Sequence, residues 1–230
     1  MTKNRSCFVY LFPLMTTFFW GATFNISVIA VHYFSPMTTA ALRFIIAAIV
    51  LFPILVFHGK KLYGIFKQNW LVHIIMALTG VVGFNALFFI GMQYTLPLNG
   101  ALIMATNPLV AALISAIITK EVIDRKHKIG TTISFIGVLI LLFNGSGKLG
   151  HINIGDLYIM GACISLALYG VIGKKYQKNS TPILTTGITT MIGVIILCAI
   201  AFGKEPFPAV TMMPTSVMLS LLFMGAFGSA

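Results

Sequence analysis

The chain has little charge, and that shortage excludes a water-soluble globule. Only 8% of its 230 residues are charged, only four residues are acidic, and 58% are hydrophobic. Soluble domains carry roughly 25% charged residues, whereas a surface in contact with lipid needs very few. The mean hydropathy of +0.99 agrees with a lipid environment. We therefore predict an all-α protein, because helices satisfy their own backbone hydrogen bonds inside a bilayer.

The chain also lacks the residue patterns of a metal, cofactor or enzyme site. Its three cysteines and five histidines follow no metal-binding spacing, and no HExxH pair is present. The segment 144–148 resembles a phosphate-binding loop, but Leu142 and Leu149 stand where that motif needs glycine and a hydroxyl residue. We predict no cofactor, no metal ion and no enzymatic activity.

The long apolar runs predict a polytopic bundle of transmembrane helices. A crossing needs about 20 predominantly apolar residues, and proline, glycine, serine and asparagine separate the runs at the expected intervals. The predicted spans are 8–32, 37–57, 71–93, 98–118, 129–145, 156–173, 182–202 and a last one that begins at about 214.

The distribution of basic residues predicts a cytoplasmic N-terminus. The net charge is +11, but the basic residues lie in short clusters between apolar runs, which argues against nucleic acid as a partner. Twelve of the 15 Lys and Arg residues fall in segments on the N-terminal side of the membrane, two fall in the opposite loops, and Arg43 lies within the second span. Cytoplasmic loops carry this kind of excess.

A weak internal repeat divides the chain into two parts. The run Pro36–Arg43 resembles the run Pro182–Thr189, with Thr189 at the position of Arg43. Five spans per copy would make the copies inverted, as in many secondary transporters. We predict a first repeat over 1–148 and an incomplete second repeat over 149–230, and we expect two further spans after Ala230.

Several motifs, in order along the chain, resemble those of the EamA-type drug/metabolite transporters. They are Trp20-Gly21-Ala22-Thr23-Phe24, Arg43-Phe44, Ala105-Thr106-Asn107-Pro108, Lys120-Glu121, Gly137-Val138, Gly155-Asp156-Leu157 and Tyr169-Gly170. The resemblance covers essentially the whole chain. It implies ten spans in two inverted five-span repeats and a transport function.

Arg43 is the most informative candidate site residue. It lies about seven residues into its span, or roughly 10 Å deep at 1.5 Å per residue, and an arginine at a helix centre costs about 2.5–3.5 kcal/mol. Three interpretations remain open: its side chain reaches the outer surface, it braces backbone carbonyls at a helix break, or it binds an anionic group.

The remaining candidates are uncharged polar and aromatic residues within the spans. Pro108 breaks the fourth span, so Thr106 and Asn107 are expected to face the bundle interior, either lining a cavity or bonding to another helix. We predict a substrate cavity between spans one, three, four and six, with Arg43 toward its outer mouth. Its predicted residues are Trp20, Asn25, Arg43, Asn85, Thr106, Asn107 and Tyr169. Asp156 is expected to cap a helix N-terminus.

These observations predict a secondary transporter of a small metabolite, such as an amino acid or a related polar compound, working by alternating access. The alternatives are a non-transporting membrane scaffold and an intramembrane enzyme, and the sequence offers no buried catalytic pair for the latter. The expected partners are a small-molecule substrate and the lipid bilayer, and a homodimer is left open. The expected location is the plasma membrane, as a multi-pass protein of the bacterial inner membrane.

Overall fold

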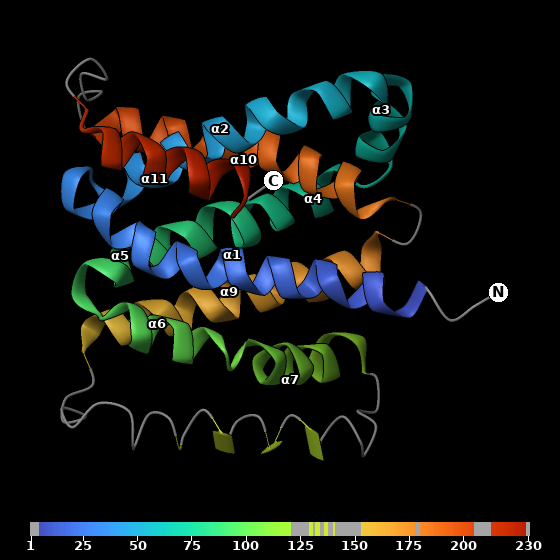
Figure 1. Ribbon diagram of the computed structural model, residues 1–230. Coiled ribbons are helices and arrows are strands. Elements are labelled where there is room, and N and C mark those ends of the chain that lie inside the picture. The colour runs from blue at the N-terminus through green and yellow to red at the C-terminus, as the bar shows by residue number, and fades with distance from the viewer. Residues whose placement is uncertain are drawn as a thin grey trace.

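The protein is a bundle of helices, as the sequence predicts (Figure 1). The computed structural model describes residues 5–120, 153–177, 180–204 and 213–228, with a few positions between 129 and 140. Six helical stretches in this part are long and apolar enough to cross a membrane, and a shorter apolar helix follows them. The helices are α1 (Arg5–Tyr33), α2 (Pro36–Phe57), α3 (Gly59–Gln68), α4 (Trp70–Met76), η1 (Ala77–Gly83), α5 (Phe84–Tyr94), α6 (Pro97–Met104), α7 (Asn107–Thr119), α9 (Ile154–Tyr176), α10 (Pro182–Lys204) and α11 (Thr215–Ala226).

The six long stretches match predicted spans one to four, six and seven within a few residues. The predicted fifth span, 129–145, lies mostly outside the described residues. The eighth prediction corresponds to α11, which has 12 residues and is shorter than a full crossing. The segment between the second and third spans, to which the sequence analysis assigns no helix, forms α3, whose Tyr63 and Phe66 are exposed.

Helix ends follow local sequence signals. Ser35 accepts a hydrogen bond from the Thr38 amide, and Pro36, which needs no amide partner, opens α2. At the start of α9, Asn153 and Asp156 form a capping box in which the Asp156 carboxylate accepts from the Asn153 amide at 3.1 Å. The expected capping role of Asp156 is therefore confirmed.

The third span is one continuous helix with an irregular centre. Between α4 and α5, the segment η1 winds as a π-helix that contains Gly80 and Gly83. Single π-helical turns occur mostly inside α-helices and often near functional sites. Two residues after this turn, Asn85 donates from its side chain to the Val81 carbonyl at 2.7 Å, which ties the polar side chain to the irregular segment.

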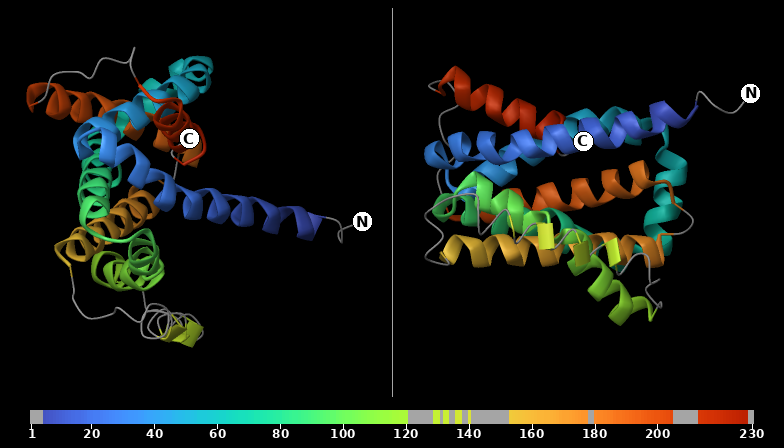
Figure 2. Two further views of the ribbon diagram at one scale, coloured as in Figure 1. Left: turned by 60° about the vertical axis from the view of Figure 1, so that its left-hand side comes forward. Right: turned by 60° about the horizontal axis from the view of Figure 1, so that its bottom comes forward.

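The fourth span is broken where Pro108 predicts a break. α6 ends at Met104 and α7 begins at Asn107, because proline cannot donate the amide bond that would continue the helix. In Figure 2, α7 turns away from the direction of α6. α7 ends at Thr119, and the next residue, Lys120, has a left-handed φ of 54° that stops the helix.

Glycines set the contacts between neighbouring helices. Gly91, near the end of α5, faces Gly155, near the start of α9, so these two helices are antiparallel neighbours. A Cβ on Gly155 would lie 2.8 Å from the Gly91 carbonyl oxygen, so only glycine allows this approach. α2 and α10 also pack antiparallel, with Leu55 facing Gly187.

The N-terminal part of α1 projects from the bundle (Figure 2). Leu14 and Phe18 on this part are 67% and 73% exposed, while Ala30 and Val31 near the other end are buried. The core instead gathers the inner faces of α1, α2, α5, α9 and α11 around Phe24, Phe44, Phe88 and Phe89. Arg43 and Asn85 are among the polar side chains buried with this core, and they begin the description of the candidate site.

Candidate functional site

Arg43 lies inside the bundle, within hydrogen-bonding distance of two other helical segments. Its side chain is only 4% exposed. One guanidinium nitrogen donates to the Asn85 side-chain oxygen at 3.3 Å, and another donates to the Gly228 carbonyl at 2.7 Å, just after α11. The rings of Phe44 and Phe89 lie 5.7 and 5.8 Å from the guanidinium carbon. Arg43 therefore does not extend to the surface, and it does brace a backbone carbonyl at a helix end.

A small cavity adjoins Arg43 and is walled by aromatic side chains. We call it the Arg43 cavity; its volume is about 20 Å³, room for about one water molecule. Trp20 lies parallel to Phe84 with ring centroids 6.3 Å apart, and Phe24 meets Phe88 edge-on at 5.4 Å. The cavity is lined by Trp20, Thr23, Phe24, Arg43, Phe84, Phe88 and Met104. Residues from the first four predicted spans thus meet at one polar point.

Both helix irregularities lie beside this cavity. Asn85, which bonds to Arg43, follows the π-helical segment by two residues. Met104, which lines the cavity, is the last residue of α6 before the break. Membrane proteins place irregular backbone where it is covered by protein or lines a cavity, and discontinuous helices form the binding sites of many transporters.

Thr106 and Asn107 face the bundle interior but not the Arg43 cavity. The Asn107 amide donates to the Cys163 carbonyl of α9 at 3.1 Å, and its nitrogen lies 3.6 Å from the Cys163 sulfur. The Thr106 hydroxyl donates to the Ile103 carbonyl at 2.6 Å. Of the two expected roles, helix-to-helix bonding describes this arrangement, and it holds the broken fourth span against α9.

Tyr169 and Asn25 lie elsewhere. The Tyr169 hydroxyl lies 3.4 Å from the Thr186 hydroxyl, in a separate cavity between α9 and α10. Asn25 is exposed on α1 and is not among the residues that line either cavity. The structure thus brings together three of the seven predicted residues, Trp20, Arg43 and Asn85, and separates the other four.

Sequence reasoning missed several residues of the Arg43 cavity. Phe24 follows Trp20 by four residues, and Phe88 follows Phe84 by the same interval, so each pair lies on one helical face. That spacing was the available signal. Gly228 had no such signal, because its carbonyl comes from a residue 185 positions away. Within the described ranges, no three His, Cys, Asp or Glu side chains gather to form a metal site.

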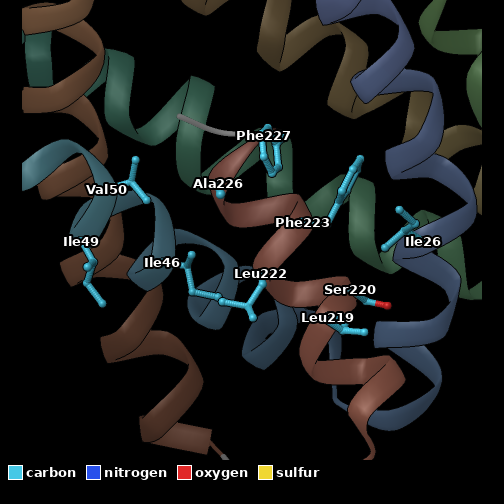
Figure 3. A pocket seen from close by; sticks show the side chains of 10 residues that line it. All are labelled: Ile26, Ile46, Ile49, Val50, Leu219, Ser220, Leu222, Phe223, Ala226 and Phe227. Carbon is cyan, nitrogen blue, oxygen red and sulfur yellow. The ribbon is translucent and has the colours of Figure 1, made fainter.

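A wider cavity between α1, α2 and α11 is apolar. Its volume is about 720 Å³, and Figure 3 shows its lining side chains on α1, α2 and α11. The one polar lining residue, Ser220, donates its hydroxyl to the Ser216 carbonyl of its own helix at 2.7 Å. This surface can accommodate hydrocarbon but offers no group to orient a polar substrate.

The chain matches the EamA-like transporter family over residues 8–143 and 153–230. It is similar to the "Uncharacterized transporter YyaM" of Bacillus subtilis (strain 168), with 38% identity over 96% of this chain and 73% of that protein. It is also similar to the "Uncharacterized transporter YetK" of the same strain, with 23% identity over 79% of this chain and 56% of that protein.

A solved crystal structure has a similar fold. It superimposes with a TM-score of 0.66 at 19% identity, covering 94% of this chain and 72% of that chain. The sequence match and the six membrane-length helices agree on a multi-pass membrane protein. Members of the matched family are transporters and not enzymes. This chain belongs to the EamA-like transporter family of membrane proteins, within the drug/metabolite transporters.

Proposed function

We propose that the protein is a secondary transporter of a small polar metabolite and that Arg43 binds part of that substrate. The observation that carries the proposal is the meeting of the first four spans at one buried cation. Arg43, the Asn85 amide and the aromatic wall lie together beside a π-helical segment and a helix break. Buried ionisable residues within membrane spans are costly and commonly serve a functional pathway.

The chemistry of the cavity favours an amino acid or a related compound. A guanidinium presents several donors in a plane and pairs well with a carboxylate. The Trp20 and Phe84 rings offer flat apolar surface for the rest of such a molecule, and an ammonium group would be attracted to the ring faces. The Asn85 amide adds a neutral polar group beside the guanidinium.

Transport by alternating access requires this site to open. At about 20 Å³ the Arg43 cavity is too small for a metabolite, so we infer that the described conformation is closed around it. Inverted repeats over 1–148 and 149–230 would exchange conformations and expose the site to each side in turn. The π-helical segment and the break before α7 are the places where the backbone can adjust.

We propose a plasma-membrane location with a cytoplasmic N-terminus, because twelve basic residues lie on the predicted inner side. Labelling of single cysteines in intact cells tests this orientation. A cysteine at position 126 should be protected from external reagents, and a cysteine at position 148 should react. The reverse pattern would contradict the proposed orientation.

Initial rates of uptake into proteoliposomes, measured with a panel of radiolabelled amino acids and neutral analogues, test the function. Arg43→Gln should slow zwitterionic and anionic substrates more than neutral ones. Asn107→Leu should abolish transport while insertion and folding persist, because the broken fourth span loses its bond to α9. Equal rates for wild type and Arg43→Gln would contradict the proposed site. No movement of any substrate by the wild-type protein would favour a non-transporting scaffold.

A further inference from the structure

A second polar cavity lies between α9 and α10, with Met76 of α4 on its wall. We call it the α9–α10 cavity. Its volume is about 380 Å³, which falls within the range of small-ligand pockets, whereas the Arg43 cavity holds about 20 Å³. The polar side chains that line it are Tyr169, Lys174, Gln177, Ser180, Thr185 and Thr186. In this conformation it is therefore a polar cavity with room for a metabolite.

The wall of the α9–α10 cavity is an ordered hydrogen-bonded surface. Thr185 donates its hydroxyl to the Ser180 hydroxyl at 2.8 Å, which ties the start of α10 to the preceding loop. Nδ1 of the buried His73 lies 2.9 Å from the Asn69 carbonyl and donates to it, so its Nε2 accepts from the Gln177 amide at 3.2 Å. Gln177 is thus held in position at one end of the cavity.

The charge of the cavity is of one sign. Lys174 lines it, and no aspartate or glutamate is among its described lining residues. The neighbouring Lys175 donates to the Ile118 carbonyl of α7 at 2.8 Å and lies 5.2 Å from the Tyr176 ring. A smaller cavity of about 280 Å³ adjoins it, sharing Gln177 and Ser180 and adding Lys175.

We propose that the α9–α10 cavity binds the carboxylate of a small hydroxy or amino acid. Lys174 supplies the positive charge, and the Tyr169–Thr186 hydroxyl pair supplies a donor to the carboxylate. The Thr185 hydroxyl, which donates to Ser180, accepts from the neighbouring hydroxyl or ammonium group. The cavity as an anion site stands on its own geometry. Its role as a loading site for a transported substrate rests on the proposed function.

Gly170 provides a way to fill the cavity without disturbing its walls. It lines the cavity, and a Cβ built on it would meet no atom within 4 Å. A leucine at this position would therefore project into open space. Gly203 of α10 has equally open surroundings and lies outside the cavity lining, so Gly203→Leu is the matched control.

The test measures access and charge preference at a cysteine inside the cavity. Thr186→Cys is introduced after Cys7, Cys163 and Cys198 have been replaced by alanine, and the protein is placed in phosphatidylcholine nanodiscs. The cysteine should react faster with an anionic methanethiosulfonate than with a cationic one, by on the order of fivefold for one nearby unit charge. Lys174→Gln should remove this preference, Gly170→Leu should slow both reagents, and Gly203→Leu should change neither.

Protection by a ligand completes the test. Lactate should slow labelling in a concentration-dependent way, whereas glycerol at the same concentration should not. Protection only when phosphatidylglycerol replaces part of the lipid would assign the site to a lipid headgroup and overturn the proposal. Equal rates for both reagents, or no reaction with either, would also overturn it. None of these readouts depends on transport. The experiment can therefore support the anion site even if the transport proposal is wrong, and it can reject the anion site even if the transport proposal is right.

Discussion

α2 and α10 begin with similar sequences but differ in the hydrogen bonds that they make. Each starts with a proline, Pro36 or Pro182, and carries threonine three residues later, at Thr39 and Thr185. The two helices pack against each other antiparallel. Seven residues after each proline the likeness stops, because Arg43 occupies the position in α2 and Thr189 occupies it in α10.

Both residues at this register are buried, but their hydrogen bonds go to different places. Arg43 donates to Asn85 of α5 and to Gly228 after α11. The Thr189 hydroxyl donates to the Thr185 and Thr186 carbonyls of its own helix, at 3.0 and 2.9 Å. α2 therefore joins three helical segments through one cation, whereas α10 is satisfied locally. Arg43 therefore links separate helices, whereas the Thr189 hydroxyl at the equivalent position bonds only within its own helix.

Replacing Arg43 should have the largest effect. Arg43→Ala removes two hydrogen bonds from a charged donor, each worth about 1.5–3 kcal/mol, and leaves buried acceptors at Asn85 and Gly228. We expect a loss of about 3 kcal/mol in unfolding free energy and a transport rate at least about tenfold lower. Thermal unfolding in detergent and proteoliposome uptake measure the two effects.

Thr189→Ala is the matched control for Arg43→Ala. It should cost about 1 kcal/mol and leave transport measurable, since its hydroxyl serves only its own helix. Equal losses of stability and transport in the two variants would contradict this comparison. They would mean that the hydrogen bonds of Arg43 to other helices contribute no more than the local hydrogen bonds of Thr189.

A smaller effect is expected where α11 approaches α2. A Cβ on Gly225 would lie 2.6 Å from the Ile46 Cβ and 2.8 Å from the Arg43 carbonyl oxygen, so Gly225→Ala must move α11 away from Arg43. We expect a cost of about 2 kcal/mol from overpacking. The three atoms nearest to a Cβ on Gly187 of α10 all belong to the Leu55 side chain, which can rotate. The cost of Gly187→Ala should be largely offset by the gain in helix propensity, and equal melting temperatures for both variants would contradict this.

The first turns of α2 and α10, which both begin with proline, can be compared by removing the side chain just before each. Ser35→Ala removes the side-chain acceptor of the Thr38 amide and should cost about 1 kcal/mol, with substrate preference unchanged. At Thr181 it is the backbone carbonyl that accepts from the Leu184 and Thr185 amides, so Thr181→Ala should leave the melting temperature almost unchanged. If Ser35→Ala altered the substrate preference, the functional difference between α2 and α10 would already lie in their first turns, and not only at Arg43 and Thr189.

The smallest expected effect differs in sign between the helices. Among the described residues, the Thr39 hydroxyl is buried without a hydrogen-bond partner, while Thr185 at the same register donates to Ser180. Thr39→Val should raise the unfolding free energy by about 0.5–1 kcal/mol, and Thr185→Val should lower it by a similar amount. Melting temperatures in one detergent compare them directly. A loss in both variants would show that Thr39 has a partner in solution.

Much of the fold could be predicted because it depends on local properties of the chain. Apolar runs of about 20 residues, Pro36 and Pro182 at helix starts, and the break before Pro108 each act within a few residues of where they stand. α3 was missed because its ten residues are too short and too polar to register as an apolar run. Half-polar helices beside a membrane need the rest of the protein to reveal which side they face.

The candidate site was only partly predictable, because it depends on how the helices are rotated. Burial of polar residues was expected from the cost of leaving them unpaired in lipid. That rule does not say which partner each one finds. Asn107 could have turned to a cavity and instead turned to Cys163, 56 residues away. Asn25 and Asn85 were both expected to be buried, because each is an asparagine within a predicted span. Asn25 is exposed on α1, whereas Asn85 is buried against Arg43.

The amino-acid sequence by itself determined that this protein is a bundle of membrane-length helices of the EamA-like type, where those helices begin and end, and that Arg43 stands at a buried depth. The tertiary structure decided that Arg43 joins Asn85 and Gly228, that Tyr169 belongs to a separate cavity, and that the Arg43 cavity holds only about 20 Å³. The first set depends on transfer free energies summed along the chain. The second depends on close approaches at glycines such as Gly155 and Gly225, which set the rotation and spacing of whole helices at once.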